Sequence, residues 1–339
     1  MATMQDVAKR AGVSLSTVSY ALNGTRPISE ETRQRIFAAM EELGYQPHAL
    51  ARGLASKRSR IIALLFPTPE RGLGITELEF VTGAIDAATE RGYNLVLWSS
   101  DLHNAGGLRQ LMQQGLVDGV IMMEVHLQDE RIDLLRENGI PFTLIGRPDD
   151  PANLSYVDID FAQTTRDAVA YLVGLGHRRI AFLNQSQVEI DNGYGPVVRA
   201  QAGFTQAMAA VGLAGPVLPC LPTPGAGYEI CAALLEVDPT MTALISINER
   251  ATPGVLQALA DRGWRIPDDF SLVLIVSSGR VADMSVPPLT TMTSPSAEAG
   301  RLGVVQLIQQ LESGQQSAPQ ALLPCRLEVR GSSGPPRSG

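Results

Sequence analysis

The sequence predicts an α/β core of two similar lobes, preceded by a small all-helical unit. Three observations lead to this prediction. From Ile61 onward, short β-rich apolar runs alternate with amphipathic helical stretches, which is typical of a parallel sheet covered by helices. The same alternation starts a second time near Val157. The first 60 residues instead carry helix start and stop signals without strand patterns, so we expect them to form a unit of their own.

Two short helices joined by a tight turn are predicted between residues 4 and 23. Thr3 with Asp6 forms a capping box ahead of the first helix, and Ser14 is a favoured N-cap for the second. Gly12 stands where the chain must reverse, a position that favours a residue without Cβ.

The second of these helices has two different faces. At about 100° per residue, Val18 and Ala21 fall on one side, and a short row without acidic residues falls on the other. That row consists of Leu15, Ser16, Ser19, Tyr20 and Asn23. Such a face suits a DNA major groove, although the helix pair alone fits an ordinary core fragment equally well.

A third helix follows and favours the DNA-binding alternative. Ser29 with two acidic residues starts it, apolar residues recur at helical spacing at Ile36, Met40 and Leu43, and Gly44 ends it. Three helices of this length form the small unit that presents a recognition helix to DNA.

The core is predicted from its strands and helices in chain order. In the first lobe we expect strands at 61–66, 94–100, 119–123 and 142–146, with a helix at 76–91. In the second lobe we expect helices at 161–175, through 203–211 and before Gly263, and strands at 179–183, 243–247 and 270–276. Two such lobes imply a cleft at the carboxyl ends of their strands.

Charge is divided unevenly along the chain. Residues 1–60 hold nine Lys or Arg and five Asp or Glu, a balance of +4, whereas the remainder holds 18 and 30, a balance of −12. A basic module on an acidic body confines phosphate binding to one end of the molecule. The charge distribution therefore points to nucleic acid as a partner of the N-terminal unit.

Other functional classes lack support in the sequence. The three Cys have no metal or redox spacing, the four His are scattered, and neither a nucleophile elbow nor a phosphate-binding loop with its lysine occurs. The polar N-terminus is no secretion signal, and no apolar run approaches the roughly 20 residues of a membrane span. We expect a cytoplasmic protein without membrane contact, cofactor or metal ion, and no enzyme.

The order of several motifs identifies a family resemblance. DVAKRAGVSLSTVSYALNG, ETR, ELGYQP and ALARGLASKR resemble the DNA-binding headpiece and hinge of LacI/GalR transcription regulators over about sixty residues. VDID, GHRRIAFL, RAQAGF, SINERATPGVLQAL, RGWRIPDDFSLV and PPLTTM are similar to that family's core. The resemblance implies a periplasmic-binding-protein-like core of two lobes with parallel sheets and three crossovers, behind a helix-turn-helix headpiece and a hinge helix.

This resemblance sets the expected domain boundaries. The headpiece occupies 1–47, and the hinge helix and linker occupy 48–60. The first lobe takes 61–158 and about 289–318, and the second takes 159–288 and about 319–331. Residues 332–339 form a Gly, Ser and Pro tail that we expect to be disordered. Because the tail lacks leucine heptads, we expect a homodimer rather than a tetramer.

The resemblance also assigns residues to DNA. Leu15, Ser16 and Tyr20 match the positions that usually touch base edges; many members carry Arg where this chain has Tyr20, so we expect no strong guanine preference there. The expected phosphate contacts are Ser14, Thr17 and Asn23. Packing of Tyr20 on the third helix is the structural alternative.

In the hinge, Leu54 matches the leucine that wedges into the minor groove at the operator centre, with Ala55 and Arg52 beside it. Two copies are needed, and the short hinge should become helical only on the operator. The alternative is that Leu54 packs under the core.

The cleft departs from the pattern of sugar-binding members. Arg199 and Asn248 match or lie close to expected positions, and Glu249 replaces an Asp. Val276 stands where a late Asp is expected, Ser294 replaces a Gln, and Arg147 follows a Gly at a frequent Asp position. Pro222 falls near the expected aromatic platform. Several carboxylates that would accept sugar hydroxyls are therefore missing.

Three control modes remain open from these substitutions. The effector could be a sugar-like or anionic small molecule, an anion being held by Arg147 and Arg199; control could come from a partner protein; or there could be no effector. Arg199 could also form only a salt bridge at a helix start.

These observations favour a sequence-specific DNA-binding transcription regulator, expected to act as a repressor. It would bind a pseudo-palindromic double-stranded operator as a homodimer, with affinity modulated from the cleft. A solute-binding receptor would share the two-lobed core but has no use for residues 1–60. An α/β enzyme would need catalytic groups that the sequence does not offer.

Overall fold

The computed structural model describes residues 2–23, 26–45, 59–66, 73–98, 116–313 and 318–337. The N-terminal unit contains α1 (Met4–Ala11), α2 (Leu15–Asn23) and α3 (Glu30–Leu43). The predicted capping box is confirmed: the Thr3 hydroxyl accepts from the Asp6 amide, and the Thr3 amide donates to the Asp6 carboxylate. Gly12 and Gly44 both adopt the left-handed conformation that ends a helix.

One apolar cluster holds the three headpiece helices together. Its fully buried members come from all three helices: Val7, Ala8, Ala11, Val18, Ile36, Ala39 and Met40. Most are small or β-branched, so α1 and α2 can approach each other closely around the turn at Gly12. The inward face predicted for α2 is confirmed by the burial of Val18.

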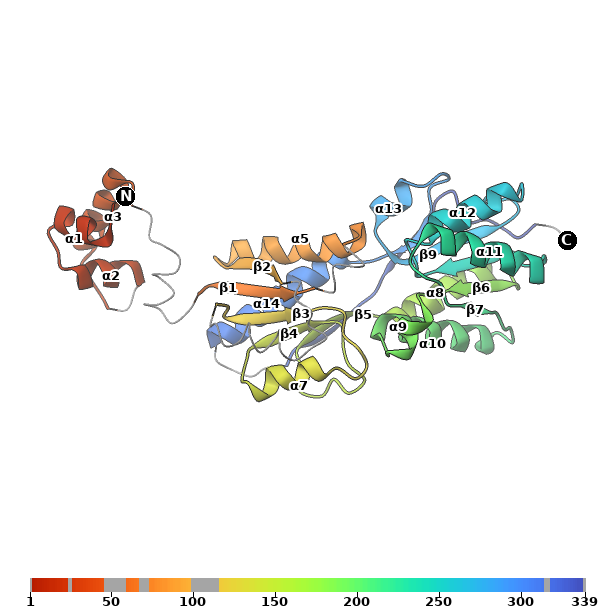
Figure 1. Cartoon of the computed structure of the whole chain (residues 1–339), viewed down its shortest axis with the longest axis horizontal. Coiled ribbons are helices and arrows are strands. Elements are labelled where there is room, and N and C mark those ends of the chain that lie inside the picture. Colours follow the sequence, from red (N-terminus) through yellow and green to blue (C-terminus); the bar gives the residue numbers. More distant parts are fainter. Residues whose placement is uncertain are drawn as a thin grey trace.

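The first lobe is a six-stranded sheet in the order β11-β5-β4-β3-β1-β2, with every pair parallel. Its strands are β1 (Ile61–Leu65), β2 (Asn94–Trp98), β3 (Gly119–Met122), β4 (Phe142–Ile145), β5 (Tyr156–Ile159) and β11 (Gln320–Leu323). Helices α5 (Ile75–Glu90) and α14 (Ser296–Ser313) share an apolar cluster on one face of the sheet, and α7 (Glu130–Glu137) packs on the other (Figure 1).

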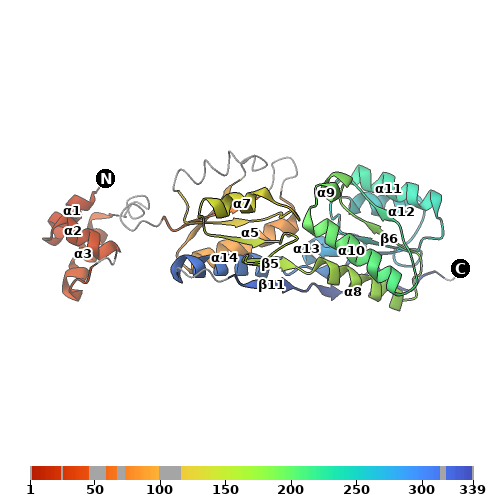
Figure 2. The same ribbon diagram turned by 90° about the horizontal axis from the view of Figure 1, so that it is seen from below.

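The second lobe repeats this plan with the order β12-β10-β9-β8-β6-β7. Its strands are β6 (Ile180–Leu183), β7 (Val217–Leu218), β8 (Ala243–Ser246), β9 (Ser271–Ser277), β10 (Thr290–Thr293) and β12 (Arg326–Glu328), the last antiparallel to β10. Helices α8 (Phe161–Gly174) and α10 (Gly195–Ala210) cover one face, and α11 (Pro224–Val237) and α12 (Thr252–Asp261) the other. The short helices α9 (Gln187–Asp191) and α13 (Gly279–Asp283) lie at the lobe junction (Figures 1 and 2).

The chain passes between the lobes three times, as the resemblance implied: after β5, after β10 and after β11. Two expected boundaries were wrong. The strand at 290–293 pairs with β9 in the second lobe, so the return to the first lobe begins only afterwards. The strand at 320–323 pairs with β5 in the first lobe, so only the segment from 326 onward belongs to the second. Each of these two strands is only four residues long and carries too few apolar residues to reveal which sheet it joins.

The expectation of a disordered tail is also wrong for residues 332–337. The Ser332 hydroxyl donates to the Leu272 carbonyl at 2.6 Å and accepts from the Thr290 amide at 2.7 Å. The Ser333 hydroxyl lies 2.8 Å from the Tyr171 phenol. Ser332 thus satisfies backbone groups at the start of β9 and β10, and Ser333 bonds to side-chain hydroxyls, roles that a Gly, Ser and Pro composition does not reveal.

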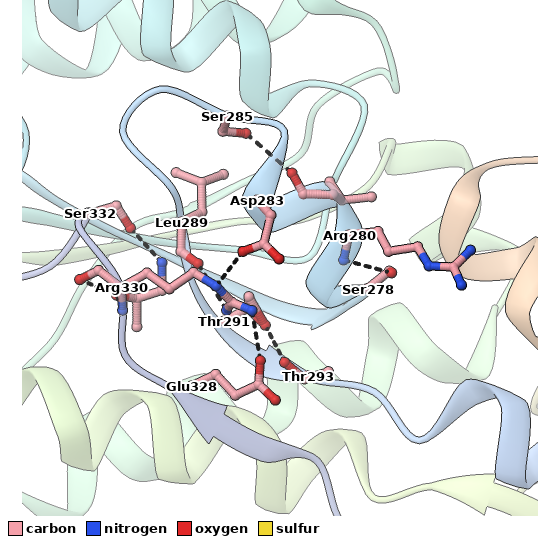
Figure 3. A network of polar contacts seen from close by, with 12 residues as sticks. Ser278, Arg280, Asp283, Ser285, Leu289, Thr291, Thr293, Glu328, Arg330 and Ser332 are labelled. Carbon is pink, nitrogen blue, oxygen red and sulfur yellow. Dashed lines mark hydrogen bonds and ion pairs between the residues drawn. The ribbon is translucent and has the colours of Figure 1, made fainter.

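Arg330 anchors the start of this tail (Figure 3). Its guanidinium lies between Asp283 of α13 and Glu328 of β12, with N···O distances of 2.8 and 2.7 Å. A third bond runs from the guanidinium to the Leu289 carbonyl. Arg330 therefore ties the last strand of the second sheet to the helix that follows β9.

Candidate DNA-reading surface and effector cleft

The N-terminal end of α2 presents a hydroxyl cluster. The Ser14 hydroxyl accepts from the Thr17 amide at 3.1 Å and lies 2.8 and 2.7 Å from the hydroxyls of Ser16 and Thr17. Ser14 and Ser16 are exposed, and the Leu15 side chain is 48% exposed. The structure thus brings the predicted residues Ser14, Leu15, Ser16 and Thr17 onto one accessible surface, while Asn23 is the last residue of α2.

Tyr20 follows one turn later on the same helix. It is half-buried and lies outside the apolar cluster of the headpiece. The guanidinium carbon of Arg26 stands 5.2 Å from the centre of its ring, within the range of a cation–π contact. Arg26 was not among the predicted residues, because it lies beyond α2 and only the fold brings it back to the helix.

The hinge residues Arg52, Leu54 and Ala55 lie outside the described residues, and so does most of the predicted linker.

The second candidate site is a cavity between the two lobes. The empty space between its walls is about 1030 Å³, open solvent included. Its walls come from both lobes and are mostly apolar, with four aromatic rings: Phe66, Phe80, Phe161 and Tyr194. The cleft predicted from the pair of α/β lobes is therefore present, at the carboxyl ends of the strands.

Half of the predicted cleft residues line this cavity. Asn248, Glu249 and Val276 belong to its wall, and so do Gly146 and Pro222. Arg147, Arg199 and Ser294 do not. Ser294 is buried behind the wall, where its hydroxyl accepts from that of Ser296 at 2.8 Å.

The two arginines are engaged by neighbouring protein groups. Arg147 Nε donates to Asp158 Oδ2 at 3.1 Å, and Arg199 Nη2 donates to the Pro148 carbonyl at 2.9 Å. Burial raises the pKa of Asp158 to about 7, although Arg199 and Arg147 favour the ionised carboxylate. These arginines, predicted as partners of an anionic ligand, thus bond to Asp158 and to the Pro148 carbonyl and are not among the residues that line the cavity. Asp158 lines the cavity and was missed: nothing in VDID separates it from Asp160.

Glu249 connects the two lobes. Its Oε2 accepts from Thr76 Oγ1 of α5 at 2.6 Å and from Ser277 Oγ of β9 at 2.8 Å. Burial raises the pKa of Glu249, against the lowering effect of these two hydroxyls. Thr76 Oγ1 also accepts from the Ser278 amide at 2.9 Å. We call Thr76, Glu249, Ser277 and Ser278 the latch.

A second set of contacts closes the opposite side of the cavity. The Leu127 amide donates to the Gly193 carbonyl at 2.7 Å, and the Gly195 amide donates to the Val125 carbonyl at 3.2 Å. Both bonds join a loop of the first lobe to the segment around α9 and α10. The lobes thus meet along both sides of the cavity.

Other kinds of site are not found in the described parts of the chain. There, three or more His, Cys, Asp or Glu side chains nowhere gather in a way that could bind a metal ion. No helix in the same residues has the length and apolar character needed to cross a membrane.

A three-helix unit with an exposed recognition helix, followed by two lobes around a cavity, defines a ligand-responsive transcription regulator. Residues 3–48 match the model of bacterial regulatory proteins of the lacI family, and residues 169–333 match a periplasmic binding protein-like domain. Catabolite control protein A of Priestia megaterium is 30% identical over 337 residues, covering 97% of this chain and 98% of that protein. The chain belongs to the lacI family of bacterial regulatory proteins.

Further similarities extend over nearly the whole length. The HTH-type transcriptional regulator AscG of Escherichia coli (strain K12) is 33% identical, covering 94% of this chain and 95% of that protein. The solved complex of the transcriptional regulator CelR with cellobiose has a TM-score of 0.73 and 28% identity, covering 98% and 100% of the two chains. The lac repressor dimer bound to operator and anti-inducer has a TM-score of 0.83 at 24% identity, covering 98% and 99%.

Proposed function

We propose that this regulator binds a pseudo-palindromic DNA operator as a homodimer and represses transcription until a small molecule in the cleft changes its affinity. The observation that carries the proposal is the combination of an exposed, acid-free α2 surface with a cavity whose walls come from two lobes. The protein would act in the cytoplasm, where its DNA target lies, and would catalyse no reaction.

In this proposal, α2 enters the major groove. Leu15, Ser16 and Tyr20 contact base edges, with Leu15 offering an apolar contact such as one to a thymine methyl. Ser14, Thr17 and Asn23 contact phosphates and fix the register of the helix without reading sequence. The mutual hydrogen bonds of Ser14, Ser16 and Thr17 support these roles, because they hold the hydroxyls in place before DNA arrives.

Coupling between cleft and operator follows from linkage. An effector alters operator affinity only through its different affinity for two arrangements of the lobes, and such couplings usually amount to about 1–3 kcal/mol. The latch on one side and the Leu127 and Gly195 contacts on the other are the bonds that a change in lobe arrangement would break or form. The solved complex of a related regulator with cellobiose supports an effector in this cleft.

Operator binding by the full chain tests the proposal. We would select operator fragments from random DNA and measure affinity by fluorescence anisotropy between about 50 and 200 mM salt. The expected result is two chains bound per palindromic fragment, with affinity that falls steeply as salt rises because phosphate contacts release counterions. Equal affinity for selected and scrambled fragments, or one chain per fragment, would contradict the proposal.

A further inference from the structure

We infer that the cleft accepts a largely apolar, ring-containing ligand with one or two hydrogen-bond donors, rather than a free sugar, and that Val276 selects it. This inference rests on the proposed function, because it concerns the effector of the same site. It is argued from the wall of the cavity, from the hydrogen bonds already made there, and from the backbone at Val276.

The wall offers rings and aliphatic groups on both sides. Phe66 and Phe80 come from the first lobe, Phe161 and Tyr194 from the second, and the remaining apolar surface is aliphatic or proline. Small-molecule sites of this kind bury most of the ligand against apolar and aromatic side chains, with a few polar groups that orient it. A ligand that fills this cavity must therefore present apolar faces to it.

Several polar side chains in the wall already have partners within the protein. Asn248 Nδ2 donates to the carbonyls of Asn184 and Cys220, at 3.3 and 2.9 Å, and its Oδ1 accepts from the Ala251 amide at 3.2 Å. These bonds use both amide hydrogens of Asn248 and one of the two lone pairs on its side-chain oxygen. Asn248, a predicted cleft residue, lines the cavity and also holds segments of the second lobe together.

Glu249 and Asp158 are similarly committed. Glu249 Oε2 accepts two hydroxyl bonds within the latch, and Asp158 Oδ2 accepts from Arg147. A free sugar carries several hydroxyls that must each find a partner when buried, since an unmatched polar group in an apolar site opposes binding. The hydrogen bonds that Asn248, Glu249 and Asp158 already make within the protein are not available to ligand hydroxyls.

Charge indicates the polarity of the few groups that a ligand can carry. Among the described residues of the wall, four carry carboxylates, namely Glu77, Glu124, Asp158 and Glu249, and one, Arg250, is a cation. Carboxylates accept hydrogen bonds and repel anions. The ligand's polar groups are therefore N–H or O–H donors, and an anionic ligand is disfavoured.

Val276 is placed in the wall by an irregular backbone. Along the β9–β10 pair, Ile275 pairs with Met292 and Ser277 pairs with Thr293, so Val276 is the extra, unpaired residue of a β-bulge. Such bulges redirect a side chain next to functional sites. The bulge gives the cleft an apolar side chain at the position where sugar-binding relatives were expected to carry an acceptor.

The backbone at Val276 is strained as well as irregular. Its φ of 54° lies in the left-handed region, which a β-branched residue rarely adopts. Asn and Asp tolerate this conformation better than Val, so the backbone conformation does not account for a valine at this position. The apolar side chain itself must then be the useful feature, and contact with an apolar ligand supplies the reason.

Fluorescence titration of the full-length protein with N-phenyl-1-naphthylamine tests the inference. This neutral aromatic amine has two ring systems and one N–H donor, and its emission rises in apolar surroundings. We expect saturable binding of one molecule per chain, with no displacement by glucose, galactose or ribose at millimolar concentration. Substitution of Val276→Asn should weaken binding at least tenfold, because an amide then faces the apolar wall.

A matched variant separates the cleft from the rest of the surface. Val237 ends α11 with 86% of its side chain exposed, so Val237→Asn makes the same chemical change far from the cavity and should leave probe binding unchanged. Thermal melting of both variants reports folding, which Asn at a left-handed position should not impair. Val276→Asp repeats the test with a charge and should abolish probe binding.

Three results would overturn the inference: no saturable probe binding to the wild-type chain, equal binding to wild type and Val276→Asn, or displacement of the probe by a free sugar. Operator affinity measured on the same samples keeps the two proposals apart. A protein that binds its operator and releases it with a free sugar retains the proposed function and loses this inference. If the protein binds no operator, the proposed function is contradicted. Probe binding still tests separately whether the cleft accepts an apolar ligand.

Discussion

At the residue scale, Tyr20 is the proposed base contact whose chemistry most limits what α2 can read. A phenol offers one hydroxyl, whereas an arginine at a base-contacting position can bind a guanine through two hydrogen bonds. The Tyr20 ring also contacts Arg26, whose guanidinium carbon lies 5.2 Å from the ring centre. Tyr20 therefore combines a single polar contact with support for a neighbouring cation.

We predict that operators selected from random DNA show no invariant guanine opposite Tyr20. Substitution of Tyr20→Phe keeps the ring beneath Arg26 and removes the hydroxyl, so affinity should fall by about 1 kcal/mol, the usual net value of one hydrogen bond. Selection followed by anisotropy measures both effects. An invariant guanine whose preference disappears in Tyr20→Phe would show that the phenol reads it.

His177 gives the fold a dependence on pH. The imidazole is buried, with Nδ1 2.9 Å from Thr242 Oγ1 and Nε2 2.9 Å from the Gly334 carbonyl. Burial lowers the pKa of His177 from its ordinary value of 6.5, although the Gly334 carbonyl acts in the opposite direction. In the unfolded chain the imidazole therefore binds a proton at a higher pH than it does in the folded protein.

We predict that the free energy of unfolding falls as pH decreases below about 6.5. The total loss is about 1.4 kcal/mol for each pH unit that separates the pKa of His177 in the unfolded chain from its lower pKa in the folded protein. The contribution of His177 is complete above the unfolded pKa and is lost as pH falls through the folded one. Denaturant unfolding between about pH 8 and 5 measures this slope. His177→Gln removes the titrating group and should flatten the curve; an unchanged slope would assign it to other residues.

At the scale of elements, the C-terminal segment 331–337, which we call the strap, packs against the second lobe. Ser332 and Ser333 bond to residues of β9, β10 and α8, and the Arg337 guanidinium lies 4.2 Å from the Trp264 ring centre. The strap follows Arg330, which Asp283 and Glu328 hold in place (Figure 3).

We predict that truncation after Arg330 lowers the melting temperature by several degrees. The deletion leaves buried backbone groups at the Thr290 amide and the Leu272 carbonyl without partners, at about 1–3 kcal/mol each. Removal of Ser338 and Gly339 alone is the control and should have little effect. Equal melting temperatures for the two truncations would show that the strap adds no stability.

Helices α5 and α14 approach each other through glycine. A Cβ added at Gly300 would lie 2.0 Å from the Phe80 carbonyl oxygen, and one added at Gly83 would lie 2.0 Å from that of Ala297. Both distances are far below van der Waals contact, so the two helix backbones would have to separate.

We predict that Gly300→Ala destabilises the protein by about 1–3 kcal/mol, despite the higher helix propensity of alanine. Gly174 in α8 is the matched control, because a Cβ there meets nothing within 4 Å. Gly174→Ala should be neutral or slightly stabilising. Denaturant midpoints of the two variants give the comparison, and equal stability would mean that the helix pair can relax.

At the scale of the whole molecule, the latch bonds the two lobes directly to each other. Thr76 is its central member, since its hydroxyl donates to Glu249 and accepts from the Ser278 amide. Both partners belong to the second lobe, whereas Thr76 belongs to the first. Removing this hydroxyl breaks two bonds between the lobes and leaves each lobe intact.

We predict that Thr76→Val shifts the full chain toward a more open arrangement, by about 1–3 kcal/mol for the two lost bonds. Small-angle X-ray scattering would then report a larger radius of gyration, and operator affinity should change in the same variant. Thr82→Val is the control, because Thr82 lies on the same helix and bonds only to the Glu79 carbonyl. Equal scattering from both variants would exclude the latch as a determinant of closure.

What the sequence determined by itself were the local features. Helix caps and left-handed helix ends depend on residues within a few positions of one another, so the sequence alone predicts them. The examples are the caps at Thr3, Ser14 and Ser29 and the helix ends at Gly12 and Gly44. The repeated alternation of strands and helices likewise predicted two lobes and a cleft.

Only the tertiary structure decided which side chains meet across the cleft. Arg147 and Arg199 stand in the sequence where a ligand contact was expected, but they bond to Asp158 and to the Pro148 carbonyl and do not line the cavity. Thr76 and Glu249 meet although 173 positions separate them, and the Ser332 hydroxyl of the tail bonds to the buried Thr290 amide. The physical reason is that a hydrogen-bonding group can pair with any group of complementary chemistry. Which partner it has therefore depends on which groups the folded chain brings within about 3 Å of it.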